Sequence, residues 1–129
     1  MSAVVLDASA LIAMLKKEPG GDRVAEIIGD SKITAINYAE VISHFCHAGM
    51  PTTEVDAMLN PLPLVIVPAD AKLARLAGHL RTITSSVGLS LGDRFCLAFA
   101  KLESLPAWTS DRKWQAISEA VQVEITIIR

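Results

Sequence analysis

Four acidic residues, each in an apolar part of the chain, are the side chains whose type and placement suit them best for chemistry. They are Asp7, Glu40, Asp93 and Asp111. Burying a carboxylate is costly unless a positive charge compensates it, and a hard divalent cation bound by oxygen atoms is a natural partner. If the fold brings the four together, they form a Mg²⁺ or Mn²⁺ site that is suited to phosphodiester chemistry.

The elements that must position these acids can be predicted from hydrophobic periodicity. Short apolar runs rich in β-branched residues predict five strands, at residues 4–6, 32–35, 64–67, 106–109 and 123–128. Helical periodicity predicts helices at residues 9–17, 22–29, 36–48, 52–60, 70–80, 89–105 and 112–120. Strands that alternate with helices imply an α/β fold. We therefore expect a mostly parallel five-stranded sheet with helices on both faces, in three layers.

The predicted elements place the acids consistently. Ligands of such sheets bind beyond the carboxyl ends of the strands. Asp7 and Asp111 each lie at or just past the end of a predicted strand. Glu40 lies in the first turns of the helix that follows the second strand. The acids therefore point to one edge of the sheet.

Each acid also has an ordinary structural interpretation. Asp7 and Asp111 are suitable helix N-caps. Asp93 is an early-turn acid that the helix dipole favours, and Glu40 is compatible with a solvated helix surface. Each interpretation is sufficient for a single residue, but four acids at consistent positions on one edge favour a shared site.

Two groups of basic side chains give weaker signals. His44 and His47 lie three residues apart on one predicted helix. No third ligand pairs with them, so surface or partly packed histidines are the favoured interpretation. Lys72, Arg75 and His79 form a basic stripe on another predicted helix. A solvated helix face is favoured there over a track for RNA phosphates.

The charge balance does not decide whether the chain binds nucleic acid. The formal net charge is −2, from 14 acidic and 12 basic residues, which alone argues against nucleic-acid binding. Without the four proposed ligands, however, 10 of the 14 acids remain against 12 bases. The rest of the chain is thus slightly basic.

The hydrophobic content bears on assembly and location. Hydrophobic residues make up 51% of the 129 residues, so we expect some apolar surface to face a second copy or a partner. No apolar run approaches the roughly 18 residues needed to span a membrane. The first residues also lack the pattern of a signal peptide, so we expect a cytoplasmic protein with no membrane partner.

The segments around the four acids resemble the signature segments of PIN domains. These segments are residues 4–11, 37–41, 89–98 and 109–114. They are most similar to the VapC-type toxins of bacterial and archaeal toxin–antitoxin pairs. The resemblance covers essentially the whole chain, so we expect one PIN domain over residues 1–129.

The resemblance implies a function and a set of site residues. It implies a metal-dependent endoribonuclease that cleaves RNA with Mg²⁺- or Mn²⁺-activated water. It also implies a homodimer and a cognate antitoxin protein that blocks the acidic site. The residues that match the family's acids and supporting hydroxyl groups are Asp7, Glu40, Asp93 and Asp111, with Ser9 and Thr109.

The roles within this set follow partly from the resemblance and partly from sequence position. We expect Asp7, Asp93 and Glu40 to bind metal directly, and Asp111 to bind it directly or through water. Arg94 and Arg112 each stand next to a site acid. They are expected either to touch phosphate or to balance charge. Whether one or two ions bind stays open.

Two other functions are compatible with parts of the pattern. One is an aspartyl-phosphate phosphatase with Asp7 as the nucleophile. Such enzymes usually carry a second aspartate two residues later, where this chain has Ser9. The other is a non-catalytic interaction module that keeps the PIN fold, against which the four intact acids argue.

Overall fold

The chain is built around one parallel five-stranded sheet. The computed structural model describes residues 3–129, so the first two residues of the predicted domain lie outside the described residues. The strand order is β3-β2-β1-β4-β5, and each neighbouring pair is parallel. The strands are β1 (Val4–Leu6), β2 (Ser31–Thr34), β3 (Val65–Val67), β4 (Ala107–Thr109) and β5 (Ile125–Ile127). The predicted parallel five-stranded sheet is confirmed.

The helices connect these strands. They are α1 (Ala8–Lys16), α2 (Gly21–Ile27), α3 (Ala35–His47), α4 (Thr52–Leu59), α5 (Ala71–His79), α6 (Arg81–Thr84), α7 (Leu91–Glu103) and α8 (Ser118–Val121). Short 3₁₀ turns are η1 (Ile28–Asp30), η2 (Ser85–Val87) and η3 (Arg112–Ile117). The last predicted helix, 112–120, is therefore mostly 3₁₀. Within residues 3–129, none of the helices has the length and apolar character needed to cross a bilayer.

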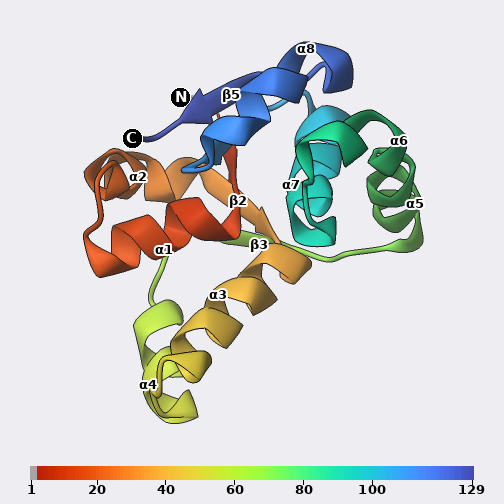
Figure 1. Cartoon of the computed structure of the whole chain (residues 1–129). Helices are drawn as coiled ribbons and strands as arrows, with labels where there is room; N and C mark the ends of the chain where they lie inside the picture. The colour runs from red at the N-terminus through yellow and green to blue at the C-terminus, as the bar shows by residue number, and fades with distance from the viewer. Residues whose placement is uncertain (1–2) are drawn as a thin grey trace.

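The two faces of the sheet are covered by different helices, which gives the three layers. Side chains alternate between the faces of a strand. Accordingly, Val5 packs with residues of α5 and α7, whereas Val4 and Leu6 pack with residues of α1, α2 and α3. Figure 1 shows α5 and α7 on one side of the sheet, and α1 and α2 on the other. The expected α/β/α arrangement is confirmed.

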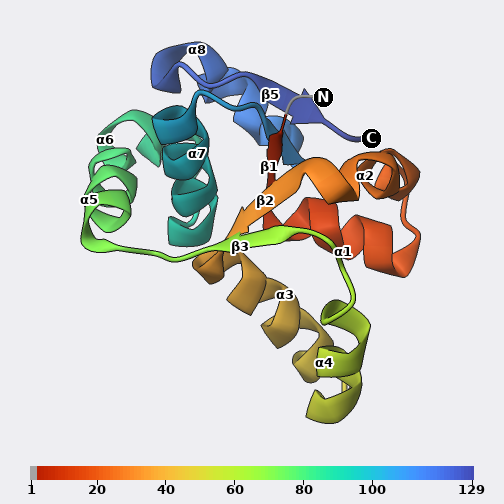
Figure 2. The same ribbon diagram turned by 180° about the vertical axis from the view of Figure 1, so that it is seen from behind.

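Helices α3 and α4 extend away from this body in both views (Figures 1 and 2). Helix α3 begins directly at the carboxyl end of β2, where the Thr34 side chain caps it by accepting a hydrogen bond from the Asn37 backbone N–H. Its first turns therefore lie at the edge of the sheet where the acids were expected. Its later turns lead outward from that edge.

The edge strand β3 leaves apolar side chains in solvent. Val65 is 55% exposed and Ile66 is 43% exposed. The central strand β1 is by contrast buried along its whole length. An exposed apolar edge strand is a surface that proteins usually cover.

A candidate metal-binding active site

The four predicted acids line one pocket at the carboxyl edge of the sheet. The pocket has a volume of about 290 Å³. Its lining residues are Asp7, Ala8, Ser9, Ile12, Glu40, His44, Asp93 and Asp111. The acids come from four separate parts of the chain: the end of β1, helix α3, the first turn of α7 and the end of β4. The fold thus brings together residues that are up to 104 positions apart.

Asp7 is the most buried of the four acids, with 4% of the residue exposed. Its Oδ1 accepts a hydrogen bond from the Ala10 N–H at 2.8 Å, which makes Asp7 the N-cap of α1. The Thr109 hydroxyl donates to Oδ2 at 2.5 Å. The Ser9 hydroxyl lies 2.8 Å from Oδ1 and 3.0 Å from Oδ2. Asp7 is therefore fixed by donors from both β4 and its own helix.

Burial raises the pKa of Asp7 from 3.8 to about 7. The hydrogen bonds from Thr109, Ala10 and Ser9 oppose this rise, and the negative charge of Asp93 adds to it. A carboxylate that is costly to ionise because it is buried is one that a cation would stabilise in its charged form.

The Ser9 and Thr109 hydroxyls link α1 to β4 under the pocket. Their oxygens are 3.3 Å apart. Ser9 Oγ accepts from the Ser110 N–H at 3.0 Å, and Thr109 Oγ1 accepts from the Asp111 N–H at 3.1 Å. The two predicted supporting hydroxyls therefore tie Asp7 to the segment that carries Asp111.

Glu40 is held in place from both α3 and α7. Asn37, one turn earlier on α3, donates from Nδ2 to Glu40 Oε1 at 2.8 Å and to the Gly92 carbonyl at 2.9 Å. A Cβ atom on Gly92 would overlap the Glu40 carboxylate, so the absence of a side chain there makes room for it. Glu40 is exposed as a whole residue, yet burial of its carboxylate end raises its pKa.

Asp93 and Asp111 each take part in capping the N-terminus of a helix, α7 for Asp93 and η3 for Asp111. Asp93 belongs to a capping box: its Oδ2 accepts from the Ser90 N–H at 2.9 Å, while its own N–H donates to Ser90 Oγ at 3.1 Å. Asp111 is the N-cap of η3, with Oδ1 accepting from the Lys113 N–H at 3.0 Å. The Lys113 ammonium lies 3.9 Å from Asp111 Oδ2. Both acids therefore keep capping contacts at the pocket.

The two predicted supporting arginines do not line the acidic pocket. Arg94 is only 6% exposed and donates from Nη1 to the Ala77 carbonyl of α5 at 3.2 Å. It follows Asp93 directly in the sequence, but consecutive residues of a helix point about 100° apart, so it faces α5 instead. Arg112 is exposed and donates weakly to the Arg129 carbonyl at 3.5 Å.

The carboxylates surround the pocket without meeting at one point. Over residues 3–129, no three or more His, Cys, Asp and Glu side chains are arranged closely enough to hold an ion. The capping contacts of Asp7, Asp93 and Asp111 turn their oxygens toward backbone N–H groups. Even so, the acids interact electrostatically, since the charge of Asp93 raises the pKa of both Asp7 and Glu40. The all-oxygen donor set is of the type that hard cations prefer.

The roles of two site residues, Asn37 and Gly92, were not predicted, although both lie in segments that resemble the PIN signatures. Their contact joins positions 55 residues apart. The sequence signal that could have identified Asn37 is its polar side chain in an apolar helical stretch, three positions before Glu40. Asn37 is 1% exposed, and buried amides are normally fully hydrogen-bonded.

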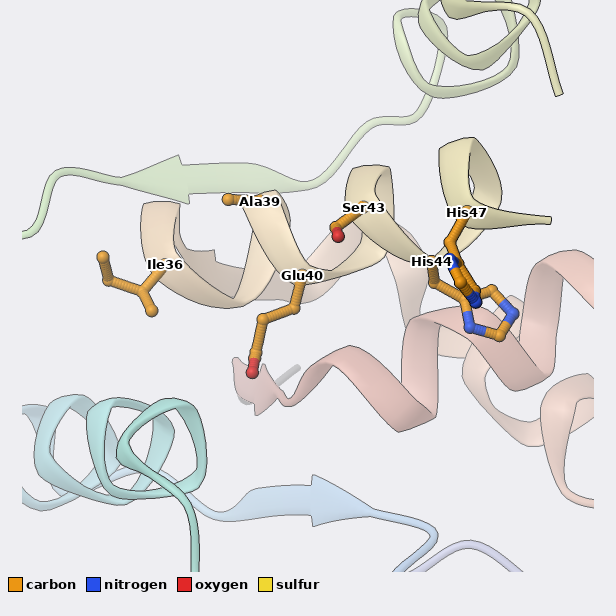
Figure 3. A pocket seen from close by; sticks show the side chains of 6 residues that line it. All are labelled: Ile36, Ala39, Glu40, Ser43, His44 and His47. Atoms are coloured by element: carbon orange, nitrogen blue, oxygen red, sulfur yellow. The ribbon is translucent and has the colours of Figure 1, made fainter. Parts of the chain in front are cut away.

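A larger, shallower groove continues from the acidic pocket along α3. Its volume is about 580 Å³, and its lining residues are Ile36, Ala39, Glu40, Ser43, His44 and His47 (Figure 3). Glu40 and His44 line both hollows. The acidic pocket therefore opens onto the outer turns of α3.

Several solved structures share this fold over most of their length. A DNA-bound VapBC complex from Salmonella typhimurium is 19% identical with a TM-score of 0.75, covering 98% of each chain. VapBC-5 from Mycobacterium tuberculosis is 25% identical with a TM-score of 0.61, covering 97% of this chain and 98% of that one. VapC20 from Mycobacterium tuberculosis, described as cleaving the sarcin-ricin loop, is 11% identical with a TM-score of 0.72, covering 88% and 94%.

Comparison with curated protein sequences gave no match. The family model described as PIN domain matches residues 4–120. That range contains all four acids of the pocket and all but the last strand of the sheet. The chain belongs to the PIN domain family.

Proposed function

We propose that this protein is a metal-dependent endoribonuclease and the toxin of a type II toxin–antitoxin pair. The observation that carries the proposal is the arrangement of Asp7, Glu40, Asp93 and Asp111 around one pocket. This arrangement occurs in a PIN-domain chain whose structural relatives include a toxin described as cleaving the sarcin-ricin loop. The proposed substrate is therefore RNA.

The proposed cofactor is Mg²⁺ or Mn²⁺. Asp7, Asp93 and Glu40 would hold the ion directly, and Asp111 would hold it directly or through water. When bound, a divalent ion supplies Lewis acidity toward the phosphate and makes water a stronger nucleophile. Thr109 and Ser9 keep the Asp7 carboxylate oriented, while Asn37 does the same for Glu40.

The proposed partners are an antitoxin and a second copy of the chain. Related structures are toxin–antitoxin complexes, among them one from Klebsiella pneumoniae and a DNA-bound VapBC complex from Rickettsia felis. A pocket lined by four carboxylates is complementary to a basic side chain, so an antitoxin that inserts one would block the site. The exposed apolar edge of β3 supports self-association.

The phosphatase alternative is less compatible with the contacts of Asp7. Both of its oxygens accept hydrogen bonds, and burial raises its pKa to about 7. The hydrogen bonds lower the nucleophilicity of the carboxylate, and the raised pKa lowers the fraction of Asp7 that is ionised at neutral pH. The other alternative, a non-catalytic interaction module, is also less compatible, because it gives the four acids of the pocket no role.

One purified-protein assay separates the three functions. The wild type and Asp7→Asn are incubated with single-stranded RNA and, separately, with p-nitrophenyl phosphate. Each reaction is run with Mg²⁺, with Mn²⁺ and with EDTA. The proposal expects internal RNA cleavage by the wild type with either metal, and loss of cleavage in EDTA and in Asp7→Asn. Metal-independent cleavage that persists in Asp7→Asn would contradict it. Hydrolysis of p-nitrophenyl phosphate alone would favour the phosphatase, and no activity would favour the module.

A further inference from the structure

The groove along α3 carries a feature that the four acids do not explain. His44 lies one helical turn beyond Glu40 and lines both the acidic pocket and the groove. Among the described residues that line the acidic pocket, it is the one basic side chain. In Figure 3, the Glu40, His44 and His47 side chains extend from α3 toward the same side, where α1 runs.

The His44 ring is held in position before any ligand arrives. The residue is half-buried, and its ring meets the ring of buried Phe45 edge-on, with centroids 5.2 Å apart and an interplanar angle of 88°. The ring makes no side-chain hydrogen bond to residues 3–129 that would occupy its N–H. The His44 ring N–H can therefore donate to a ligand at the mouth of the acidic pocket, and the packed ring loses little conformational entropy when it does so.

The ligand that suits this position is a phosphate of the RNA strand. Four carboxylates repel a polyanion, so a strand that reaches them needs donors at the approach. One helical turn between Glu40 and His44 spans about 5–6 Å along the axis, which is comparable to one nucleotide step. The remaining groove offers apolar surface from Ile36 and Ala39 for a base or sugar.

We infer that His44 binds the phosphate adjacent to the scissile one, and that the RNA strand leaves the acidic pocket along α3. This inference rests on the proposed ribonuclease function. Within it, His44 is a substrate-binding residue that positions the strand, and the four acids carry the chemistry. His47 lines only the outer groove and does not reach the acidic pocket.

The test compares His44→Ala, His44→Gln and the matched control His79→Ala with the wild type; His79 is exposed on α5 and lines neither hollow. The probe is a fluorophore-labelled single-stranded RNA that the wild type cleaves at saturating Mg²⁺. Loss of a contact made equally in the ground and transition states raises KM and leaves kcat unchanged. We expect KM to rise about tenfold in His44→Ala, as for a hydrogen bond to a charged group. His44→Gln keeps an N–H donor and should recover part of the loss, whereas His79→Ala should stay within about twofold of wild type, because it removes no such bond.

Two controls keep the outcomes distinct. Thermal melts show whether each variant is folded, and light scattering shows whether its oligomeric state has changed. If the wild type cleaves RNA but His44→Ala keeps its KM, the inference is overturned while the ribonuclease proposal stands. If the His44 variants change the oligomeric state without changing KM, the groove is a protein interface and the inference is also overturned. If the wild type cleaves no RNA, both proposals fail.

Discussion

Asp7 shows how one position serves two purposes. It caps α1 and also lines the acidic pocket, and Asp93 and Asp111 likewise cap α7 and η3 while lining the same pocket. Helices that follow parallel strands begin at the carboxyl edge of the sheet, so their capping residues collect there. The structure thus confirms Asp7 and Asp111 as helix caps and Asp93 as a first-turn acid, and these ordinary positions place all three at the same pocket.

The raised pKa of Asp7 predicts a pH dependence of stability in the absence of metal. Between about pH 4 and pH 7 the folded protein keeps a proton on Asp7 that the unfolded chain has released. The free energy of unfolding should therefore fall as pH rises through this window, by roughly 1 kcal/mol per pH unit from this group. Asp7→Asn lacks this contribution. Urea unfolding of both proteins in EDTA at several pH values measures the difference.

Comparing Asp7→Asn with the wild type at each pH controls for the other titrating groups. Asparagine alters hydrogen bonds with Thr109 and Ser9, which shifts the whole curve, but all other titrating groups are shared. The stability of Asp7→Asn relative to wild type should grow from pH 5 to pH 7 and level off above. Parallel curves across this range would show that Asp7 has an ordinary pKa, contrary to the burial seen in the structure.

Residues of the site differ in how far the sequence could predict them. Asp7 and Asp111 could be placed because each ends a recognisable strand. Asn37 could not be assigned a role, because its contact with Gly92 depends on how α3 packs against α7. For Arg94, adjacency to Asp93 suggested a place at the site. The helical rotation between consecutive residues instead turns its side chain toward α5.

At the scale of elements, the site depends on the contact between α3 and α7. Asn37 and Glu40 of α3 meet Gly92 of α7, where a hydrogen bond and the missing side chain together set the separation. Asp7, at the start of α1, and Asp111, just after β4, are joined separately through Ser9 and Thr109. The pocket is thus assembled from two pairs of elements.

Gly92→Ala should displace Glu40 without unfolding the protein. The added methyl group would overlap the Glu40 carboxylate, which is the free end of a flexible side chain and can move. We expect Mn²⁺ affinity to fall about tenfold or more, as when a supporting contact of a metal ligand is lost. Calorimetric titration with Mn²⁺ measures this change.

The matched control is Gly78→Ala, a change of the same kind within α5. No atom lies within 4 Å of a Cβ placed there. That variant should bind Mn²⁺ like the wild type, with stability unchanged or raised by up to about 1 kcal/mol, because alanine favours the helix. Equal Mn²⁺ affinities for Gly92→Ala and Gly78→Ala would show that the position of Glu40 does not matter to the metal.

Element types were predictable from periodicity, but some boundaries were not. Strands and long helices have clear repeats, whereas α6, η2 and η3 are each only three to six residues long. Segments this short show too little of the repeat for their boundaries and helix type to be predicted. The order of the strands in the sheet also could not be predicted from the sequence, since it depends on where each crossover helix packs.

At the scale of the whole molecule, the edge strand β3 predicts a homodimer. Ile66 is 43% exposed there, and the high apolar content of the chain agrees with a covered surface. Light scattering should give a dimer for wild type, and Ile66→Lys should shift it toward monomer because a buried charge is costly. Ile83→Lys is the control, since Ile83 is similarly exposed on α6. A wild-type monomer, or equal effects of both changes, would rule out association through β3.

The most direct test of the whole assembly is Mn²⁺ binding by the four acids as one site. Calorimetric titrations compare the wild type with Asp7→Asn, Glu40→Gln, Asp93→Asn and Asp111→Asn, and with Asp56→Asn as an exposed control on α4. We predict saturable binding by wild type and Asp56→Asn, and affinities at least about tenfold weaker in the Asp7, Glu40 and Asp93 variants. Asp111→Asn should show a smaller loss if that acid binds through water. Wild-type affinity in all four pocket variants would contradict a shared metal site.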